Sequence, residues 1–131
     1  MGKLTFRKVE RLTKEKSIQE LFEKGSSFYL FPFKVFFLVN PDQEYPVHQL
    51  LFSVSKKNFK RAVDRNLIKR RMREAYRLQK DAIPGSPRLI LGFIYTHKEI
   101  LLFEEMKKKI LLAFNKLSKI PFGESKPPDN R

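Results

Sequence analysis

The sequence has no cysteine and no tryptophan, and its five glycines stand singly. The absence of cysteine excludes a disulfide framework and a cysteine-ligated zinc site, and it is compatible with a reducing cytoplasm. No run of about 18 apolar residues occurs and no apolar block follows the basic N-terminus, so we expect neither a membrane span nor a secretory signal. Isolated glycines also exclude a glycine-rich phosphate loop.

Side chains that could form a self-sufficient active site are also scarce. His48 and His97 lie far apart, without acidic or cysteine neighbours at ligand spacing, so the sequence predicts no metal bound by the protein itself. Asp64 and Glu74 lie within a basic stretch, where we interpret them as charge tuning or helix capping rather than as an acid–base pair. The sequence therefore predicts no catalytic residues in this chain.

Positive charge is abundant and concentrated in one segment. The 131 residues include 28 Lys and Arg against 14 Asp and Glu, which gives a net charge of +14. Residues 56–80 alone hold eleven basic and two acidic side chains, or +9 of the +14. Such an excess indicates a polyanionic partner, with nucleic acid ahead of an anionic membrane surface. A hydrophobic fraction of 41% with 13 Phe is enough for the core of one small domain.

The apolar pattern divides residues 1–120 into the elements of a single domain. A capping box at Ser17 and Glu20, with Gly25 as the stop, predicts a short helix over 17–24. Aromatic and β-branched residues and helical periodicity predict the other elements: strands over 28–39, 48–55 and 88–96, and helices over 61–80 and 99–118. We expect residues 1–16 to form a basic, loosely held arm and residues 121–131 a disordered tail.

This order of elements predicts an α+β fold, with a small mixed sheet of three to four strands and three helices. The passage from residue 48 to residue 96 is strand–helix–strand, which is a split βαβ-type arrangement. The general rule for parallel strands would make its crossover right-handed.

The helix predicted over 61–80 separates cationic from apolar side chains. At 100° per residue one face carries Arg65, Asn66, Lys69, Arg70, Arg73 and Arg77. The opposite face carries Leu67, Ile68, Met72, Ala75 and Leu78. Like charges four residues apart cost a few tenths of a kcal/mol per pair, so stability alone would favour interspersed Glu. A solvated charged face is the alternative, although such faces usually mix signs.

We predict that this cationic face binds phosphates, because Arg offers a planar fork and Lys a mobile charge for phosphate oxygens. Lys56 and Lys57 at the preceding strand end, and Lys60 and Arg61 where the chain enters the helix, extend the face. If five or six of these groups neutralise phosphates, the RNA-binding constant decreases as salt is added. A plot of the logarithm of this constant against the logarithm of the salt concentration then has a slope of about −4.

Two aromatic residues are candidates for contact with bases. Phe36 shares a predicted strand face with Lys34, and Phe22 lies on the helix predicted over 17–24. Aromatic rings beside cations on an open sheet face can stack on the bases of single-stranded RNA. Burial in the core is the competing interpretation for both rings, and the sequence leaves it open.

The stretch SVSKK, followed by RNLIKRRMREAYR, resembles the protein component of bacterial ribonuclease P. That family carries an Arg-Asn-x-x-Lys-Arg-x-x-Arg signature on a helix, after a strand that ends in Ser-x-Ser-Lys-Lys. The matching residues are Ser53, Ser55, Lys56, Lys57, Arg65, Asn66, Lys69, Arg70 and Arg73. The similarity continues in order through most of the chain, from the basic arm to the last amphipathic helix.

The resemblance implies an accessory subunit of an endonuclease that removes the 5′ leader of precursor tRNA in the cytoplasm. The catalytic RNA performs the chemistry, and Mg²⁺ is expected in the holoenzyme through that RNA. Arg65, Asn66, Lys69, Arg70 and Arg73 would contact the catalytic RNA. A cleft between the signature helix and the sheet face, with Phe22 and Phe36, would hold the single-stranded leader. The family's strand–helix–strand crossover is left-handed, which replaces the default expectation.

Other functions stay open at this point. A small ribosomal protein that binds ribosomal RNA would be equally basic, and the RNA that copurifies with the chain separates the two. A membrane-surface module would need bulky apolar residues exposed opposite the basic face. A stand-alone nuclease would need clustered carboxylates, which the sequence lacks. We expect neither DNA nor a membrane among the partners.

Overall fold

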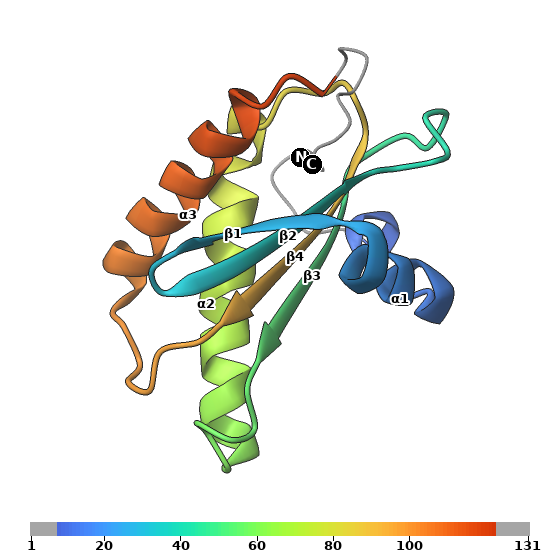
Figure 1. The fold of residues 1–131 in the computed structure, drawn as a ribbon. Helices are drawn as coiled ribbons and strands as arrows, with labels where there is room; N and C mark the ends of the chain where they lie inside the picture. Colours follow the sequence, from blue (N-terminus) through green and yellow to red (C-terminus); the bar gives the residue numbers. More distant parts are fainter. Residues whose placement is uncertain (1–7, 123–131) are drawn as a thin grey trace.

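The computed structural model describes residues 8–122, which form one mixed sheet with helices on both faces (Figure 1). The strands are β1 (Ser26–Leu30), β2 (Phe33–Val39), β3 (Gln49–Val54) and β4 (Leu89–Tyr95). The helices are α1 (Glu15–Lys24), α2 (Ala62–Gln79) and α3 (Phe103–Ser118), with short 3-10 turns at Lys8–Glu10 and Lys80–Ala82. The sheet order is β1-β2-β4-β3, in which only β3 and β4 pair in parallel. The predicted α+β class with a mixed sheet and three helices is confirmed.

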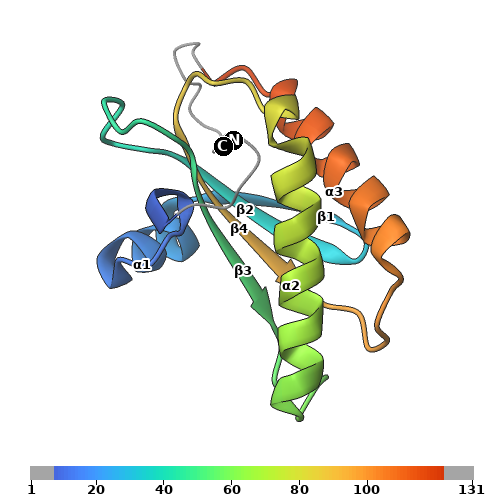
Figure 2. The same cartoon turned by 180° about the vertical axis from the view of Figure 1, so that it is seen from behind.

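The parallel strands β3 and β4 are joined through α2 by a left-handed crossover. In Figure 2, α2 lies in front of the sheet, both strands run downward, and β4 lies to the right of β3. When this view is turned upside down in the plane of the page, the strands point upward and β4 lies to the left of β3. The chain then moves to the left as it crosses in front of the sheet, which makes the crossover left-handed, whereas the general rule is a right-handed crossover. The left-handed expectation is confirmed. Because β3 is an outer strand, α2 lies at the border of the sheet.

Two apolar layers hold the helices on the sheet. α2 and α3 cover one face, where Met72, Phe93 and Phe114 are fully buried. α1 covers the other face through a smaller cluster that includes Leu21 and Ile90. Each fully buried side chain of this size contributes about 1.5–3 kcal/mol relative to its exposed state. The larger core therefore anchors α2, and the smaller one anchors α1.

The strand predicted over 28–39 is wrong as a single element, because the chain turns at residues 31 and 32 and forms the hairpin of β1 and β2. Pro32 has no N–H to donate to a sheet ladder, so it interrupts a run whose composition otherwise favours one long strand. The prediction that Lys34 and Phe36 share one face of the strand is confirmed, since Lys34 Nζ lies 5.4 Å from the Phe36 ring centroid. Phe33 and Val35 are fully buried in the larger core, while Phe36 packs on the smaller cluster.

Two helix starts differ from their predicted positions. α1 begins at Glu15 after Lys14, so the capping box at Ser17 is wrong and Ser17 lies inside the helix. The predicted stop is confirmed: Gly25 N–H donates to the Leu21 carbonyl at 3.0 Å, and a Cβ at Gly25 would lie 2.8 Å from the Phe37 carbonyl oxygen.

α3 begins at Phe103 rather than at residue 99. The Tyr95 hydroxyl donates to the Glu99 carbonyl and accepts from the Leu101 N–H, at 2.5 and 3.1 Å. These bonds hold residues 99–101 in a non-helical lead-in, an effect of one polar side chain that apolar periodicity could not reveal.

The predicted loose arm is wrong for the residues that the structure describes, from Lys8 onward. Glu10 and Leu12 are only 1% and 2% exposed, and Leu12 N–H donates to the Leu50 carbonyl at 2.8 Å. At the other end, the Phe122 ring lies 5.8 Å from the Phe37 ring, so the predicted tail is packed at its first residues. Residues 1–7 and 123–131 lie outside the described residues.

Candidate nucleic-acid interface

α2 presents one apolar and one cationic face, as its sequence predicts. Ile68, Met72, Ala75 and Tyr76 are buried against the sheet and α3. The other face exposes three residues of the predicted site: Asn66, Arg70 and Arg73. Lys69 is half-buried between them and the core. The strip formed by Asn66, Lys69, Arg70 and Arg73 is called the cationic strip below.

The three cations of this strip have no carboxylate partner among residues 8–122. Within residues 8–122 the ion pairs join Arg61 to Asp64, Arg77 to Glu74, and Lys80 to Glu10, and none involves Lys69, Arg70 or Arg73. Like charges therefore lie side by side without internal neutralisation. This geometry leaves their hydrogen-bond donors available to an external anion.

Two arginines at the ends of the predicted site have internal partners. Arg65 donates from Nη1 to the carbonyls of Phe59 and Lys60, at 2.7 and 2.9 Å, and so ties the loop after β3 to the start of α2. Arg77 donates to Glu74, which raises the pKa of Arg77 and lowers that of Glu74. Arg65 keeps other donors, whereas the charge of Arg77 is largely offset by that of Glu74.

The loop that carries Lys56, Lys57 and Arg61 is held by hydrogen bonds on both sides. Ser55 accepts from the backbone of Lys57 through its side chain and from Phe59 through its carbonyl, both at 3.1 Å. Asn58 Nδ2 donates to the Thr96 carbonyl at 3.0 Å, which links the loop to the end of β4. The three cations are exposed on this loop, next to the N-terminal end of α2.

The predicted aromatic pair is brought together, on the other face of the sheet. The Phe22 and Phe36 rings meet edge to face with their centroids 4.7 Å apart, and Lys34 Nζ lies 5.4 Å from the Phe36 centroid. Phe22 is 40% exposed, while Phe36 is half-buried. Neither ring is fully buried, so the core interpretation does not account for Phe22.

The position of this pair corrects the expected cleft. Phe36 and α1 belong to the smaller cluster, whereas α2 packs on the opposite face of the sheet. A cleft bounded by α2 and the sheet face that carries Phe36 is therefore wrong. The two predicted surfaces lie on opposite faces of the sheet.

Gly92 allows α1 to approach the sheet closely beneath the aromatic pair. A Cβ at this position would lie 3.0 Å from Leu21 Cδ2 and 3.8 Å from Phe36 Cβ. Gly92 lies opposite Phe36 in the ladder between β2 and β4. A side chain there would push Leu21, and with it the helix that carries Phe22, away from the sheet.

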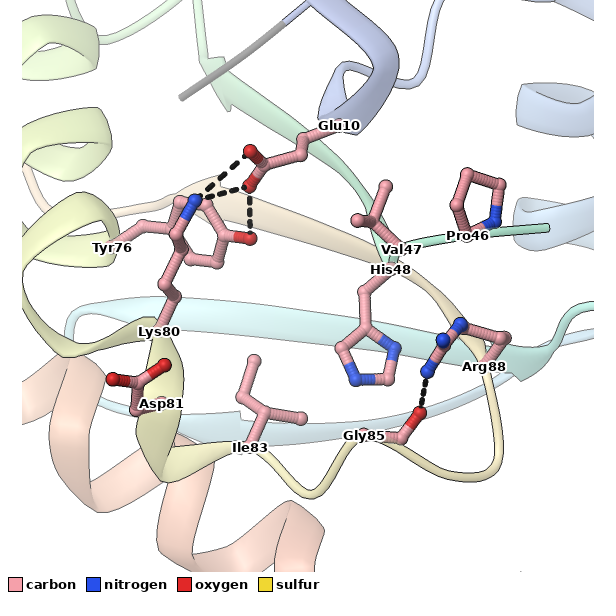
Figure 3. Close-up of a pocket in the computed structure, with 10 residues that line it drawn as sticks. All are labelled: Glu10, Pro46, Val47, His48, Tyr76, Lys80, Asp81, Ile83, Gly85 and Arg88. Carbon is pink, nitrogen blue, oxygen red and sulfur yellow. Dashed lines mark hydrogen bonds and ion pairs between the residues drawn. The ribbon is translucent and has the colours of Figure 1, made fainter. Parts of the chain in front are cut away.

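A pocket of about 540 Å³ lies at the C-terminal end of α2, between Lys80, Glu10, His48 and Arg88 (Figure 3). On one wall the buried Glu10 carboxylate accepts from the Tyr76 hydroxyl at 2.6 Å and from Lys80 Nζ at 3.0 and 3.2 Å. Sequence reasoning missed Glu10, because one acidic residue in a basic segment gives no signal of burial.

On another wall of this pocket His48 is held as a neutral ring. The Leu89 N–H donates to Nδ1 at 2.9 Å, so the ring proton lies on Nε2, which donates to the Pro84 carbonyl at 2.7 Å. Burial lowers the pKa of His48, the bond to Pro84 opposes this shift, and Arg88 adds to the lowering. His48 is a structural residue between the start of β3 and β4.

Residues 8–122 contain no group of three or more His, Asp or Glu side chains that could hold a metal ion. Among the helices in the same part of the chain, none has the length and apolar character that a membrane crossing needs.

Comparison with known proteins gives one consistent family. The family model described as Ribonuclease P matches residues 6–118. A Ribonuclease P protein component from Porphyromonas gingivalis (strain ATCC BAA-308 / W83) is 41% identical over 73 residues, which cover 56% of this chain and 53% of that protein. A relative of the same name from Geobacillus sp. (strain WCH70) is 34% identical over 110 residues, which cover 84% of this chain and 91% of that protein. The match spans about half the length of the first curated relatives.

Solved structures agree with the fold. The RNase P protein of Staphylococcus aureus superposes with a TM-score of 0.68 at 27% identity, over 84% of this chain and 95% of that one. The RNase P protein from Thermotoga maritima gives a TM-score of 0.69 at 27% identity, over 82% and 96% of the two chains.

Proposed function

The chain belongs to the ribonuclease P protein family, and we propose that it is the accessory protein subunit of a ribonucleoprotein endonuclease that removes the 5′ leader of precursor tRNA. In this role the chain binds a catalytic RNA and the leader of the substrate, and it contributes no catalytic residue of its own. The relatives named Ribonuclease P protein component support this assignment. We place the complex in the cytoplasm.

The observation that carries the proposal is the cationic strip of α2. Lys69, Arg70 and Arg73 share one helix face, without a carboxylate partner in residues 8–122, while the opposite face is anchored in the larger core. Arg binds phosphate oxygens through two parallel N–H groups, and Lys adds a point charge. A helix fixed in this way can neutralise several phosphates of a folded RNA without reorganisation.

The proposal assigns the two surfaces to different RNA segments. The strip, with Arg65 at its start and Lys56, Lys57, Arg61 and Arg77 around it, binds the catalytic RNA. Phe22 and Phe36 stack on bases of the single-stranded leader on the opposite sheet face. The two RNA segments would therefore contact opposite faces of the sheet.

Mg²⁺ in the holoenzyme is proposed to be held by the RNA. The protein would reduce repulsion between the two RNAs, so that substrate and Mg²⁺ bind at lower ionic strength. The protein's effect on cleavage is therefore expected to be largest at low Mg²⁺, where screening by ions is weakest.

The test is to assemble the chain with a bacterial ribonuclease P RNA and to measure leader removal from precursor tRNA at low Mg²⁺. The expected result is faster cleavage and tighter substrate binding than with the RNA alone. No gain in either would contradict the proposal. If the RNA that copurifies with the protein from cells is ribosomal RNA, the ribosomal alternative is favoured. Cleavage of precursor tRNA by RNA-free protein would indicate a stand-alone nuclease.

A further inference from the structure

Tyr29 lies on the face of the sheet that carries the aromatic pair, although it belongs to a different strand. It pairs with Lys34 in the antiparallel ladder of β1 and β2, and directly opposite residues of such a ladder point to the same side. Lys34 shares this side with Phe36, since its Nζ lies 5.4 Å from the Phe36 ring centroid. The neighbours of Tyr29 in β1, Phe28 and Leu30, pack on the larger core on the other face. Tyr29 is therefore a third aromatic residue on the face of the aromatic pair.

The sheet around Tyr29 is open on this face. α1 packs where Leu21 and Phe22 approach Gly92, whereas the turn between β1 and β2 lies at the end of the sheet away from α1 (Figure 1). Tyr29 and Lys34 lie beside this turn. The Tyr29 side chain is 58% exposed, and Lys34 is exposed as well. Most of the Tyr29 ring is thus accessible to a ligand that lies on the sheet.

The end of the Tyr29 side chain lies next to a fixed residue. Its hydroxyl is 3.4 Å from Thr96 Oγ1. Thr96 is itself held in place, because its Oγ1 and its N–H both donate to the Pro32 carbonyl, at 3.0 and 2.9 Å. A separation of 3.4 Å is longer than an ordinary O–H···O bond. The Tyr29 hydroxyl therefore keeps hydrogen-bonding capacity for a ligand.

Tyr29 also lies toward the end of the sheet where the loop of exposed cations begins. Its partner Lys34 lies in one row with Ser53 of β3, while Phe36 lies in one row with Leu51. Ser53 is the nearer of the two to the C-terminal end of β3, and the loop follows that end. An RNA strand that runs from the aromatic pair over Tyr29 would thus approach the cations of this loop.

The spacing of the ring and the cation fits a single-stranded nucleic acid. Tyr29 and Phe36 are diagonal neighbours on paired strands, which places their Cβ atoms about 7 Å apart. Nucleotides of a stacked strand follow one another at about 3.4 Å, so about two steps cover this distance. Lys34 lies between the two rings and forms no ion pair within residues 8–122. Its ammonium group can therefore bind a phosphate of the same strand.

We propose that Tyr29 and Lys34 form a further subsite for the single-stranded leader, in which the Tyr29 ring stacks on a base and Lys34 binds an adjacent phosphate. The proposal rests on the proposed function and adds to it a strand, β1, that carries none of the residues assigned above. Every base has a π-face, so this subsite accepts any leader sequence. It makes substrate affinity depend on leader length, because a short leader cannot reach both Tyr29 and the aromatic pair.

The first test uses the full chain and a short oligoadenylate, so it does not depend on the catalytic RNA. The ring-proton signals of Tyr29 and Phe36 are followed by NMR as the oligonucleotide is added. A stacked base shifts such signals upfield, and we expect both residues to respond along one saturable curve while Phe31 does not respond. A Tyr29 signal that does not shift, or shifts no more than that of Phe31, would overturn the subsite.

The second test measures the affinity of the holoenzyme for precursor tRNAs whose leaders lengthen by one nucleotide at a time. Tyr29→Ala is expected to weaken binding of long leaders about 10-fold, by the loss of one stacked base. The shortest leaders and mature tRNA should bind as they do to the unchanged chain. The loss should also begin at a different leader length from the loss in Phe22→Ala. An equal loss at every length, or no loss at any length, would contradict the proposal.

Three further variants separate stacking from a structural effect. Tyr29→Phe keeps the ring and should retain the affinity, whereas Tyr29→Leu keeps apolar bulk without a π-face and should lose as much as Tyr29→Ala. Phe31→Ala is the matched control. Its ring is 40% exposed on the same hairpin, but it lies edge to face with His97 and 5.9 Å from Lys109 Nζ of α3. Full affinity in Tyr29→Leu, or an equal loss in Phe31→Ala, would contradict stacking at Tyr29.

The phosphate contact is tested with Lys34→Ala. For a long leader this variant should flatten the slope of log K against log salt by about 0.7, whereas Lys108→Ala on α3 should leave the slope unchanged. Equal slopes in the two variants would exclude Lys34. If the chain binds oligoadenylate at Tyr29 but does not promote cleavage by the catalytic RNA, the proposed function fails and the subsite stands. If cleavage is promoted but Tyr29→Ala has no effect at any leader length, the subsite fails and the proposed function stands.

Discussion

Glu74 and Arg77 form a two-point ion pair on α2, with Arg77 Nε 2.9 Å from Oε1 and Nη2 2.5 Å from Oε2 of Glu74. The two residues lie three positions apart, so the pair is local to the helix. Its effect is to divide the cations of α2 into two groups. Lys69, Arg70 and Arg73 have no carboxylate partner in the described part of the chain, whereas the charge of Arg77 is opposed by its neighbour.

Arg77→Ala is therefore expected to weaken RNA binding less than Lys69→Ala. Each phosphate contact changes the slope of log K against log salt by about 0.7 on a single strand, so Lys69→Ala should flatten the slope by that amount and Arg77→Ala by much less. The measurement is RNA affinity over a series of salt concentrations. Glu74→Gln is the matched comparison, because it releases Arg77 and should make the slope steeper. Equal losses in the two alanine variants would contradict this assignment.

Phe22→Ala is expected to weaken binding of the leader rather than binding of the catalytic RNA. A ring that stacks on a base contributes about 1–3 kcal/mol per base, while this partly exposed ring contributes little to the core. The holoenzyme's affinity should fall for precursor tRNA and stay the same for mature tRNA, which has no leader. Phe22→Tyr should retain the affinity, and Leu112→Ala on α3 is a control for loss of an exposed apolar side chain. An equal loss for both tRNAs would contradict a leader site at Phe22.

Gly92→Ala is expected to lower the free energy of unfolding by about 1–3 kcal/mol, because the added methyl group overpacks a tight contact. Its Cβ would lie 3.0 Å from Leu21 Cδ2 and 4.0 Å from Phe22 Cζ. Gly85→Ala is the matched control, since its Cβ would meet Arg88 Nη1 at an ordinary 3.6 Å. Denaturant unfolding of the two variants measures the difference. Equal stabilities would show that α1 can move away from β4 without loss.

Stability should depend on pH through His48. The pKa of His48 is lowered in the folded state, so the folded chain binds this proton less readily than the unfolded chain does. The stabilisation is fully present above the unfolded pKa of about 6.5 and is lost as the pH falls toward the folded pKa. Protonation of Nδ1 would also set a donor against the Leu89 N–H.

The check is the free energy of unfolding between about pH 5 and pH 8, in the unchanged chain and in His48→Gln. The unchanged chain should lose stability relative to the variant as the pH falls below about 6.5. A difference that stays constant over this range would exclude His48 as the group responsible.

Local pattern was enough to predict the parts of the fold that local chemistry determines. Residues 61–80 carry their apolar side chains at helical spacing, and α2 forms within two residues of the predicted bounds. The alternation in Phe33, Lys34 and Val35 gave the two faces of β2 correctly. These features follow from periods of 3.6 and 2 residues, which depend only on neighbouring positions.

Contacts of individual polar side chains, some local and some between distant residues, account for much of what was missed. Nothing near Glu10 in the sequence indicates that Tyr76 and Lys80 will meet it, and no periodicity indicates that Tyr95 will bind residues 99–101. The expected cleft was wrong because contacts between residues far apart in the sequence place α2 on one face of the sheet and Phe36 on the other. The internal partners of Arg65 and Arg77 likewise became visible only in the folded chain.

The most direct test of the cationic strip is the salt dependence of binding to a bacterial ribonuclease P RNA. For the unchanged chain we predict a slope of log K against log salt of about −4, and for the triple variant Lys69→Ala, Arg70→Ala, Arg73→Ala a slope of about −2. The triple variant Lys98→Ala, Lys108→Ala, Lys119→Ala removes the same number of exposed charges elsewhere and should keep the slope of the unchanged chain. If both triple variants gave the slope of the unchanged chain, or if both lost it equally, α2 would not be the RNA-binding surface.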